Sequence, residues 1–398
     1  MSTTANNVPF ARLEQPLARL GSAVITALAS LTVVLSGLFF DDFTTSRVMP
    51  VYMALIILHC LICPKLFIFR ELGIYFALTV YFFLSLFWTP DGVVAMNTLF
   101  PASNFVLILL LFGSLLAYHD PRAVVTGALV GFWAGAAAYT AAVGFPFVYP
   151  AGFSYNGIAA VYLYGLIVTM FFGWVTGARA LTMLSALVVM GHIVASTSIK
   201  TNLGVLIGVV TALVFYFRRT MREVRRSAIY LGLALVGIVY AVMSSKAAMM
   251  MISGGFDRIV LGLDVLQTRE DKAGYSGFGE REYWMREGLL GWTRNPLFGH
   301  GAEAFRADYG ATSHSTPVDL LYNTGLIGTL LFFGMFASIA WRLLVARNIQ
   351  ANGLHALVLA GIPCYLFASL SGTIFYQSFM AIYVAFSVAL VVKAERQV

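Results

Sequence analysis

The chain of 398 residues is strongly apolar: 60% of its residues are hydrophobic, 11% are charged, and its mean hydropathy is +0.83. A soluble domain has about 25% charged residues, so this composition excludes an ordinary water-soluble globular fold. Within lipid, only helices and closed barrels satisfy their backbone polar groups. Apolar runs of roughly 15–25 residues recur in the sequence, whereas barrel strands alternate over about ten residues. The sequence therefore predicts an all-α polytopic membrane protein.

The net charge of +7 does not by itself indicate a nucleic-acid partner, because membrane topology accounts for it as described below. The cysteines Cys60, Cys63 and Cys364 all lie within apolar runs and form no disulfide pattern. The segment from His59 to Cys63 has no second ligand pair for a metal, so we interpret these as ordinary intramembrane cysteines. No cofactor is expected.

In chain order, the apolar runs predict about twelve transmembrane helices, each near the roughly 20 residues needed to cross a bilayer. The expected spans are 20–40, 48–63, 71–88, 97–117, 123–143, 157–177, 180–196, 201–217, 228–245, 317–341, 355–375 and 377–393. Residues 1–245 thus hold the first nine helices, 246–316 form one large outer loop, and 317–398 hold the last three.

Basic residues concentrate in alternate short loops, as expected for loops on the cytoplasmic side. The members of this set are Arg12, Arg19, Lys65, Arg70, Arg122, Arg179, the run Arg218 to Arg226, Arg342, Arg347, Lys393 and Arg396. Short outer loops hold only Arg47 and Lys200. Both termini are therefore expected in the cytoplasm and the 246–316 loop in the periplasm. The Arg218 to Arg226 run fits a topology determinant or a lipid-headgroup site.

Two features of the short outer loops permit a functional interpretation. Asp41 and Asp42 could hold a metal ion or could simply be acids at the membrane border. Lys200 runs against the charge trend, and either snorkelling to headgroups or substrate binding explains it.

The large outer loop contains two expected short helices. Apolar residues recur at helical spacing over 256–266, which suggests an amphipathic helix on the membrane surface. After a glycine-rich stretch, a second helix is expected at about 280–293. Asn295-Pro296 ends it, and a small-residue turn follows through Gly301.

Arg281 and His314 are the candidate reactive residues of this loop. Helical spacing puts Arg281 on the same face as Met285 and Gly288, where a charge is costly without an anionic partner. That partner is a structural acid or a phosphate. His314 comes just before a helix with Thr316 as its expected N-cap. A neutral imidazole there can accept a proton, or it simply hydrogen-bonds to the loop backbone.

These residues resemble a known family. Arg281-x-x-Trp284, the segment 295–301 (Asn-Pro-Leu-Phe-Gly-His-Gly), and His314 leading into 319–328 occur in the order typical of the O-antigen ligase and polysaccharide polymerase superfamily. Two positions depart from its usual pattern: Ser315 stands where Asn is frequent, and Lys200 stands where Arg is frequent.

The resemblance implies a metal-independent membrane glycosyltransferase of lipopolysaccharide biosynthesis in the bacterial inner membrane, working at its periplasmic face. Its donor is a glycan linked to undecaprenyl diphosphate. The acceptor is a lipid A-core sugar hydroxyl in a ligase, or another lipid-linked glycan in a polymerase. In this interpretation His314 is the base, Arg281 and Lys200 bind the diphosphate, and Tyr275 and Arg286 orient sugars. The single late loop favours a ligase.

Two other classes remain open from the sequence. A twelve-helix transporter usually has internal repeats and charges at the bilayer midplane. No repeat is evident here, and the longest polar segment follows the ninth expected span. A scaffold protein would not need the Arg281 and His314 placements.

Overall fold

The fold is known from a computed structural model of the chain. It describes residues 16–38, 45–143, 155–195, 201, 204–209, 211, 277–345, 354–370 and 377–395. Helices account for all the regular structure in these ranges. They are α1 (Pro16–Leu38), α2 (Thr45–Ile62), α3 (Arg70–Leu84), the short 3₁₀ helix η1 (Ser85–Phe87), α4 (Gly92–Tyr118), α5 (Pro121–Val143), α6 (Tyr155–Thr176), α7 (Arg179–Ala195), α11 (Gly277–Trp292), α12 (Ala304–Tyr309), α13 (Thr316–Val345), α14 (Leu354–Leu370) and α15 (Ser378–Glu395).

The described helices confirm that the chain is a helical membrane protein. Six of them are long and apolar enough to cross a bilayer: α1, α3 with η1, α4, α5, α6 and α13. The helices α2, α7, α14 and α15 are apolar but have shorter apolar segments. These ten coincide with ten of the expected spans. Only parts of the eighth span are described, and 228–245 lies outside the described residues, so the total of twelve stays a prediction.

The outer loop is described only in its second half. The amphipathic helix expected at 256–266 lies outside the described residues, as do Asp41 and Asp42. The second expected helix, about 280–293, is present as α11.

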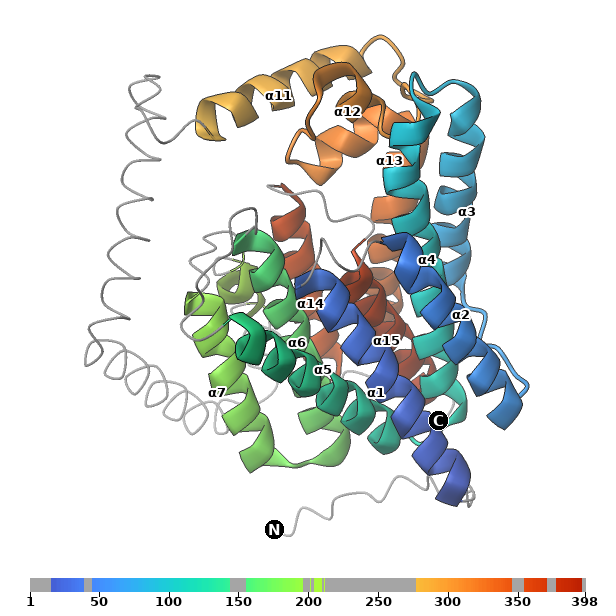
Figure 1. The fold of residues 1–398 in the computed structure, drawn as a ribbon, viewed down its shortest axis with the longest axis vertical. Helices are drawn as coiled ribbons and strands as arrows, with labels where there is room; N and C mark the ends of the chain where they lie inside the picture. The colour runs from blue at the N-terminus through green and yellow to red at the C-terminus, as the bar shows by residue number, and fades with distance from the viewer. Residues whose placement is uncertain are drawn as a thin grey trace, which may run out of the picture.

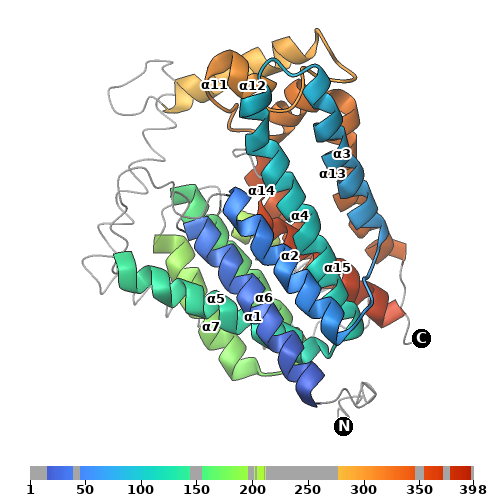
Figure 2. The ribbon, with the colours of Figure 1, turned by 45° about the vertical axis from the view of Figure 1, so that its right-hand side comes forward.

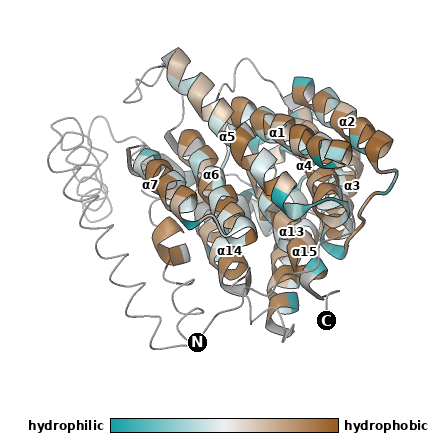
Figure 3. Ribbon diagram, turned by 90° about the horizontal axis from the view of Figure 1, so that it is seen from below, coloured by the Kyte–Doolittle hydropathy of each residue, from teal (hydrophilic) through white to brown (hydrophobic). Residues whose placement is uncertain are grey.

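Large apolar side chains cover much of the bundle surface. Leu61, Ile68 and Trp341 are each more than half exposed, which in water would be costly and in lipid is not. Seen from below, apolar residues dominate the helices of the bundle (Figure 3). The exposed apolar faces thus fit contact with lipid.

Within the bundle, small residues let helices approach closely. Gly127 and Gly131 of α5 lie against backbone atoms of Ala23 and Ala27 in α1, leaving no room for a larger side chain. Membrane helices associate through such small-residue stripes, because lipid supplies no hydrophobic force between them.

One end of the bundle is held together by charged and polar contacts. Arg19 forms an ion pair with Asp120 at 3.0 Å, and the Lys393 ammonium donates to the His119 carbonyl at 3.0 Å. The fully buried Glu71 of α3 accepts a hydrogen bond from Ser338 of α13 and also faces Arg342. Helices α11 and α12 lie at the opposite end (Figures 1 and 2). Arg19, Arg342 and Lys393, three of the described bases predicted to be cytoplasmic, thus lie at the end away from α11.

Candidate functional site

The turn at 295–301 is fastened to the ends of α3 and α4. The Tyr81 hydroxyl donates to the Phe298 carbonyl at 2.8 Å. The Ala302 amide donates to Ser85 Oγ at 2.9 Å, and Thr89 Oγ1 donates to the Ala302 carbonyl at 2.7 Å. These three hydrogen bonds hold residues 295–301, called the motif turn below, at the ends of α3 and α4.

Helix α13 is broken at Gly325, whose backbone has φ 61° and ψ −160°. A continuous helix would bond the amides of Leu326 and Ile327 to the carbonyls of Tyr322 and Asn323, four residues earlier. The motif turn satisfies all four groups instead. Its backbone accepts from Leu326 at Pro296 and from Ile327 at Leu297, at 2.9 and 3.3 Å. The amides of His300 and Gly301 donate to Tyr322 and Asn323, both at 2.8 Å.

These four hydrogen bonds between the motif turn and α13, called the backbone splice below, explain one glycine in each of the segments 295–301 and 319–328. A Cβ atom on Gly325 would collide with the Leu297 carbonyl, and one on Gly299 would collide with the backbone of Asn323. Both residues also have positive φ, a conformation that L side chains rarely adopt. Glycine is therefore required on each side of the splice.

Helix α11 sits on the outer part of α13 through small residues and an aromatic cluster. Gly288 lies against Val318, and Gly291 lies against the Tyr322 ring. Trp284 completes an aromatic cluster separate from the bundle core, formed with Phe305, Tyr309 and Tyr322. The Arg281-x-x-Trp284 motif thus anchors α11 through its tryptophan.

His300 has a structural place in this assembly. Its ring stacks on Tyr322 with centroids 4.5 Å apart. Nε2 lies 3.0 Å from the Gly291 carbonyl, which can only accept, so Nε2 carries the proton. Nδ1 then accepts from Asn295 at 3.3 Å. His300 links the end of α11 to α13.

His314 lies in a tight loop just before α13, and its side chain is exposed. Its φ of 58° is unusual for a residue other than glycine. The first helical hydrogen bond of α13 runs from the Asp319 amide to the Ser315 carbonyl at 2.9 Å. Ser315 is therefore the N-cap residue, one position before the expected Thr316. The expected placement of His314 just outside a helix N-terminus is confirmed.

Glu303 is a buried carboxyl group at the start of α12, and sequence reasoning did not single it out. It also has positive φ, 54°, and it accepts a hydrogen bond from Thr98 of α4. Burial raises the pKa of the Glu303 carboxyl, and the charge of Asp319 raises it further. The Thr98 hydrogen bond and Arg306 act in the opposite direction. Its hydrogen-bond partner Thr98 is distant in sequence. The only sequence signal for Glu303 is therefore an acid next to the glycine-containing turn.

The other predicted site residues are less fully described. Arg281 lies in the first turns of α11, and its side chain is outside the described residues, as are Lys200 and Tyr275. Arg286 projects from α11 with 76% of its side chain exposed and lies 4.0 Å from Glu287. The side chain of Glu282, one helical turn before Arg286, is outside the described residues. The structure thus brings together His314, the motif turn and α11.

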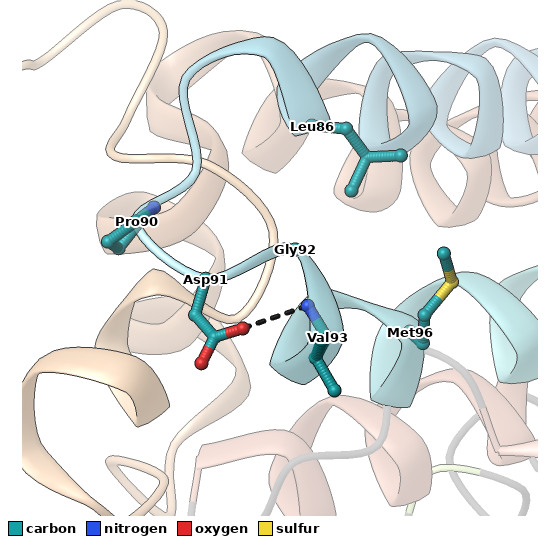
Figure 4. A pocket seen from close by; sticks show the side chains of 6 residues that line it. All are labelled: Leu86, Pro90, Asp91, Gly92, Val93 and Met96. Atoms are coloured by element: carbon teal, nitrogen blue, oxygen red, sulfur yellow. Dashed lines mark hydrogen bonds between the residues drawn. The ribbon is translucent and has the colours of Figure 1, made fainter.

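An open pocket of about 590 Å³ lies between η1 and the start of α4. Figure 4 shows Leu86, Val93 and Met96 around it, with Asp91 turned to the amide of Val93. Asp91 caps α4 by accepting from the Val93 and Val94 amides. The described residues that line it include no histidine or arginine, so this pocket does not contain the predicted reactive residues His314 and Arg281.

Comparison with known protein families supports the resemblance seen in the sequence. Residues 184–333 match the family model described as O-antigen ligase. This segment, which is less than half of the chain, is similar to the O-antigen ligase superfamily. The match includes α11, the motif turn, His314 and the break in α13, so the resemblance inferred from those residues is confirmed. No curated protein matches the chain. The match supports a general function of the O-antigen ligase or polymerase type.

Proposed function

We propose that this protein transfers a glycan from undecaprenyl diphosphate to a sugar hydroxyl of lipid A-core, at the periplasmic face of the inner membrane. The observation that carries the proposal is the exposed His314. It projects from a loop at the start of α13, next to α11, inside the matched segment. Its loop and the motif turn are both built on the same broken helix.

The proposed reaction is a direct displacement. The acceptor hydroxyl attacks the anomeric carbon of the donor glycan, and the bond to the diphosphate oxygen breaks. His314 takes the hydroxyl proton, and undecaprenyl diphosphate leaves with the bonding electrons. Arg281 and Lys200 neutralise the departing diphosphate, while Arg286 and Tyr275 contact sugars. General base catalysis of this kind contributes about 10²–10⁴ in rate.

The test is transfer from a purified lipid-diphosphate donor to a lipid A-core acceptor, with donor binding measured in parallel. His314→Ala should lower turnover by about 10²–10⁴ while donor binding survives. His314→Gln keeps a hydrogen-bonding group without a useful base, so it should be nearly as inactive. A Gln variant near the wild-type rate would reduce His314 to positioning.

Two further arms resolve the chemistry and the acceptor. EDTA should leave the wild-type rate unchanged, and sensitivity to EDTA would turn attention to Asp41 and Asp42. Offering a second lipid-linked repeat unit in place of lipid A-core distinguishes the polymerase alternative. Elongation of that lipid-linked glycan, without transfer to lipid A-core, would establish a polymerase.

A further inference from the structure

Asp319 holds both neighbours of His314. Its Oδ1 accepts the amide of Ser313 at 2.9 Å, and its own amide donates to the Ser315 carbonyl at 2.9 Å. Ser313 closes the loop from inside, because its Oγ donates to the Ser315 carbonyl at 3.0 Å. One residue in the first turn of α13 therefore sets the backbone on each side of the imidazole.

The loop that Asp319 holds is in an uncommon conformation. Among described residues other than glycine, only Glu303 and His314 have positive φ. Such conformations persist where the surroundings impose them, and they cluster at functional sites. Both residues converge on Asp319: one through the clamped loop, the other through its carboxyl group.

A pair of buried carboxyl groups lies at the base of the loop that carries His314. Asp319 is 2% exposed and Glu303 is 4% exposed, and the two carboxyl groups interact electrostatically. Arg306 of α12 acts electrostatically on Glu303, and Thr98 of α4 donates a hydrogen bond to Glu303. A helix N-terminus alone disfavours an imidazolium ion, whereas a carboxylate in the first turn offsets that effect.

We propose that Asp319 is a positioning residue for His314. Its carboxylate fixes the strained loop so that the imidazole faces the acceptor, and its charge stabilises the imidazolium formed when the acceptor hydroxyl gives up its proton. The inference rests on the proposed role of His314 as base. An ordinary helix cap would fix the loop but would not stabilise the imidazolium ion, so an experiment can separate the two effects.

Asp319→Asn is the informative variant. An Asn side chain can still accept the Ser313 amide, but it has no charge. Asp91→Asn is the matched control, because Asp91 caps α4 at the same end of the bundle through the same kind of hydrogen bond. Both variants are made in the full-length protein and assayed for glycan transfer across pH.

The expected result is specific to Asp319. Asp319→Asn should lower kcat by about tenfold or more, within the range of base catalysis, with KM for the donor little changed. The acid limb of its kcat/KM profile should move to lower pH, because loss of the carboxylate lowers the pKa of the base. Asp91→Asn should leave the limb in place. A folded Asp319→Asn protein with the wild-type limb would overturn the proposal.

A second readout is independent of catalysis. Diethyl pyrocarbonate modifies neutral imidazole. The rate at which it modifies His314, measured on the peptide that contains His314 at a series of pH values, therefore reports the titration of this residue. That titration should shift in Asp319→Asn and stay in Asp91→Asn, even if His314→Ala proves active and the proposed function fails. If Asp319→Asn does not fold, Asp319→Ser keeps a hydrogen-bond acceptor at the same position without the charge. An unshifted His314 titration in Asp319→Ser would then overturn the proposal.

Discussion

Arg281 is placed by the register of α11. It precedes Gly288 by seven residues, and helical spacing puts these two positions on the same side of the helix. Gly288 packs against Val318 in the outer part of α13, two turns before the Gly325 break. The residue therefore lies on the side of α11 that meets the helix following His314, where a diphosphate ligand is proposed.

Loss of this charge should abolish transfer without unfolding the protein. Arg281→Ala removes both the charge and the fork geometry that suits phosphate, whereas Arg281→Lys restores only the charge and should recover part of the activity. Transfer and donor binding would be measured together. Arg294→Ala, at an exposed position just after α11, is the control and should behave as wild type. Full activity in Arg281→Ala would make Arg281 a structural residue.

Glu303 gives a prediction on stability against pH. Its folded-state pKa is raised, chiefly by burial, so the folded protein holds a proton that the unfolded chain releases. Stability should therefore fall as pH rises from the unfolded pKa to the raised folded value. Glu303→Gln mimics the protonated form and should remove this slope. In detergent, the gain in Tm of Glu303→Gln over wild type should be larger at pH 8 than at pH 5.

At the scale of elements, the splice between the motif turn and α13 organises the site. Four backbone hydrogen bonds to the turn replace the two that a continuous α13 would form there. Irregular backbone near membrane depth is tolerated only where its polar groups are satisfied by protein or water. The motif turn thus both breaks α13 and satisfies the backbone groups that the break exposes.

Alanine at either glycine of this splice should disrupt it. Gly325→Ala and Gly299→Ala each place a Cβ against backbone at a positive φ, at a cost of about 1–3 kcal/mol for the strain alone. Transfer activity should be lost. Gly334→Ala is the control on the same helix, because nothing lies within 4 Å of its added Cβ. It should be active and slightly more stable. An active Gly325→Ala protein would contradict the splice as a requirement.

The sequence predicted local elements better than the contacts between them. The helix near 280–293 followed from its pattern, and the stop after it followed from Asn295-Pro296. The break at Gly325 did not, because it lies within an apolar helical run and depends on a turn more than twenty residues earlier. Glu303 was missed for the same reason: its partner Thr98 is 205 residues away.

At the scale of the whole molecule, helix length places the site near the membrane surface. The apolar part of α13, Thr316–Leu343, has 28 residues and is about 42 Å long, whereas the hydrocarbon core is about 30 Å thick. A helix needs roughly 20 residues to cross the hydrocarbon core. Counted back from Arg342, which is expected on the cytoplasmic side, such a span ends at Tyr322, close to the break at Gly325. The exposed Phe87 and Trp88 mark a similar level at the end of α3. With this span, the motif turn is expected at the interface, where the proposed donor and acceptor would meet.

The orientation of the bundle is the last prediction. The ends of α1 and α15 lie together with the α4–α5 turn, and α11 lies at the other end. Since bases such as Arg122 are expected in the cytoplasm, the site end should face the periplasm. Single cysteines are introduced at Thr293 and Lys272, which are expected on the site side, and at Arg122 and Arg222, which are expected on the other. Cys60, Cys63 and Cys364, which are free thiols, are first replaced.

An impermeant thiol reagent should label 293 and 272 in intact spheroplasts, and should label 122 and 222 only after the membrane is opened. Labelling of 122 and 222 but not 293 and 272 in intact spheroplasts would invert the topology and place His314 on the side without acceptor.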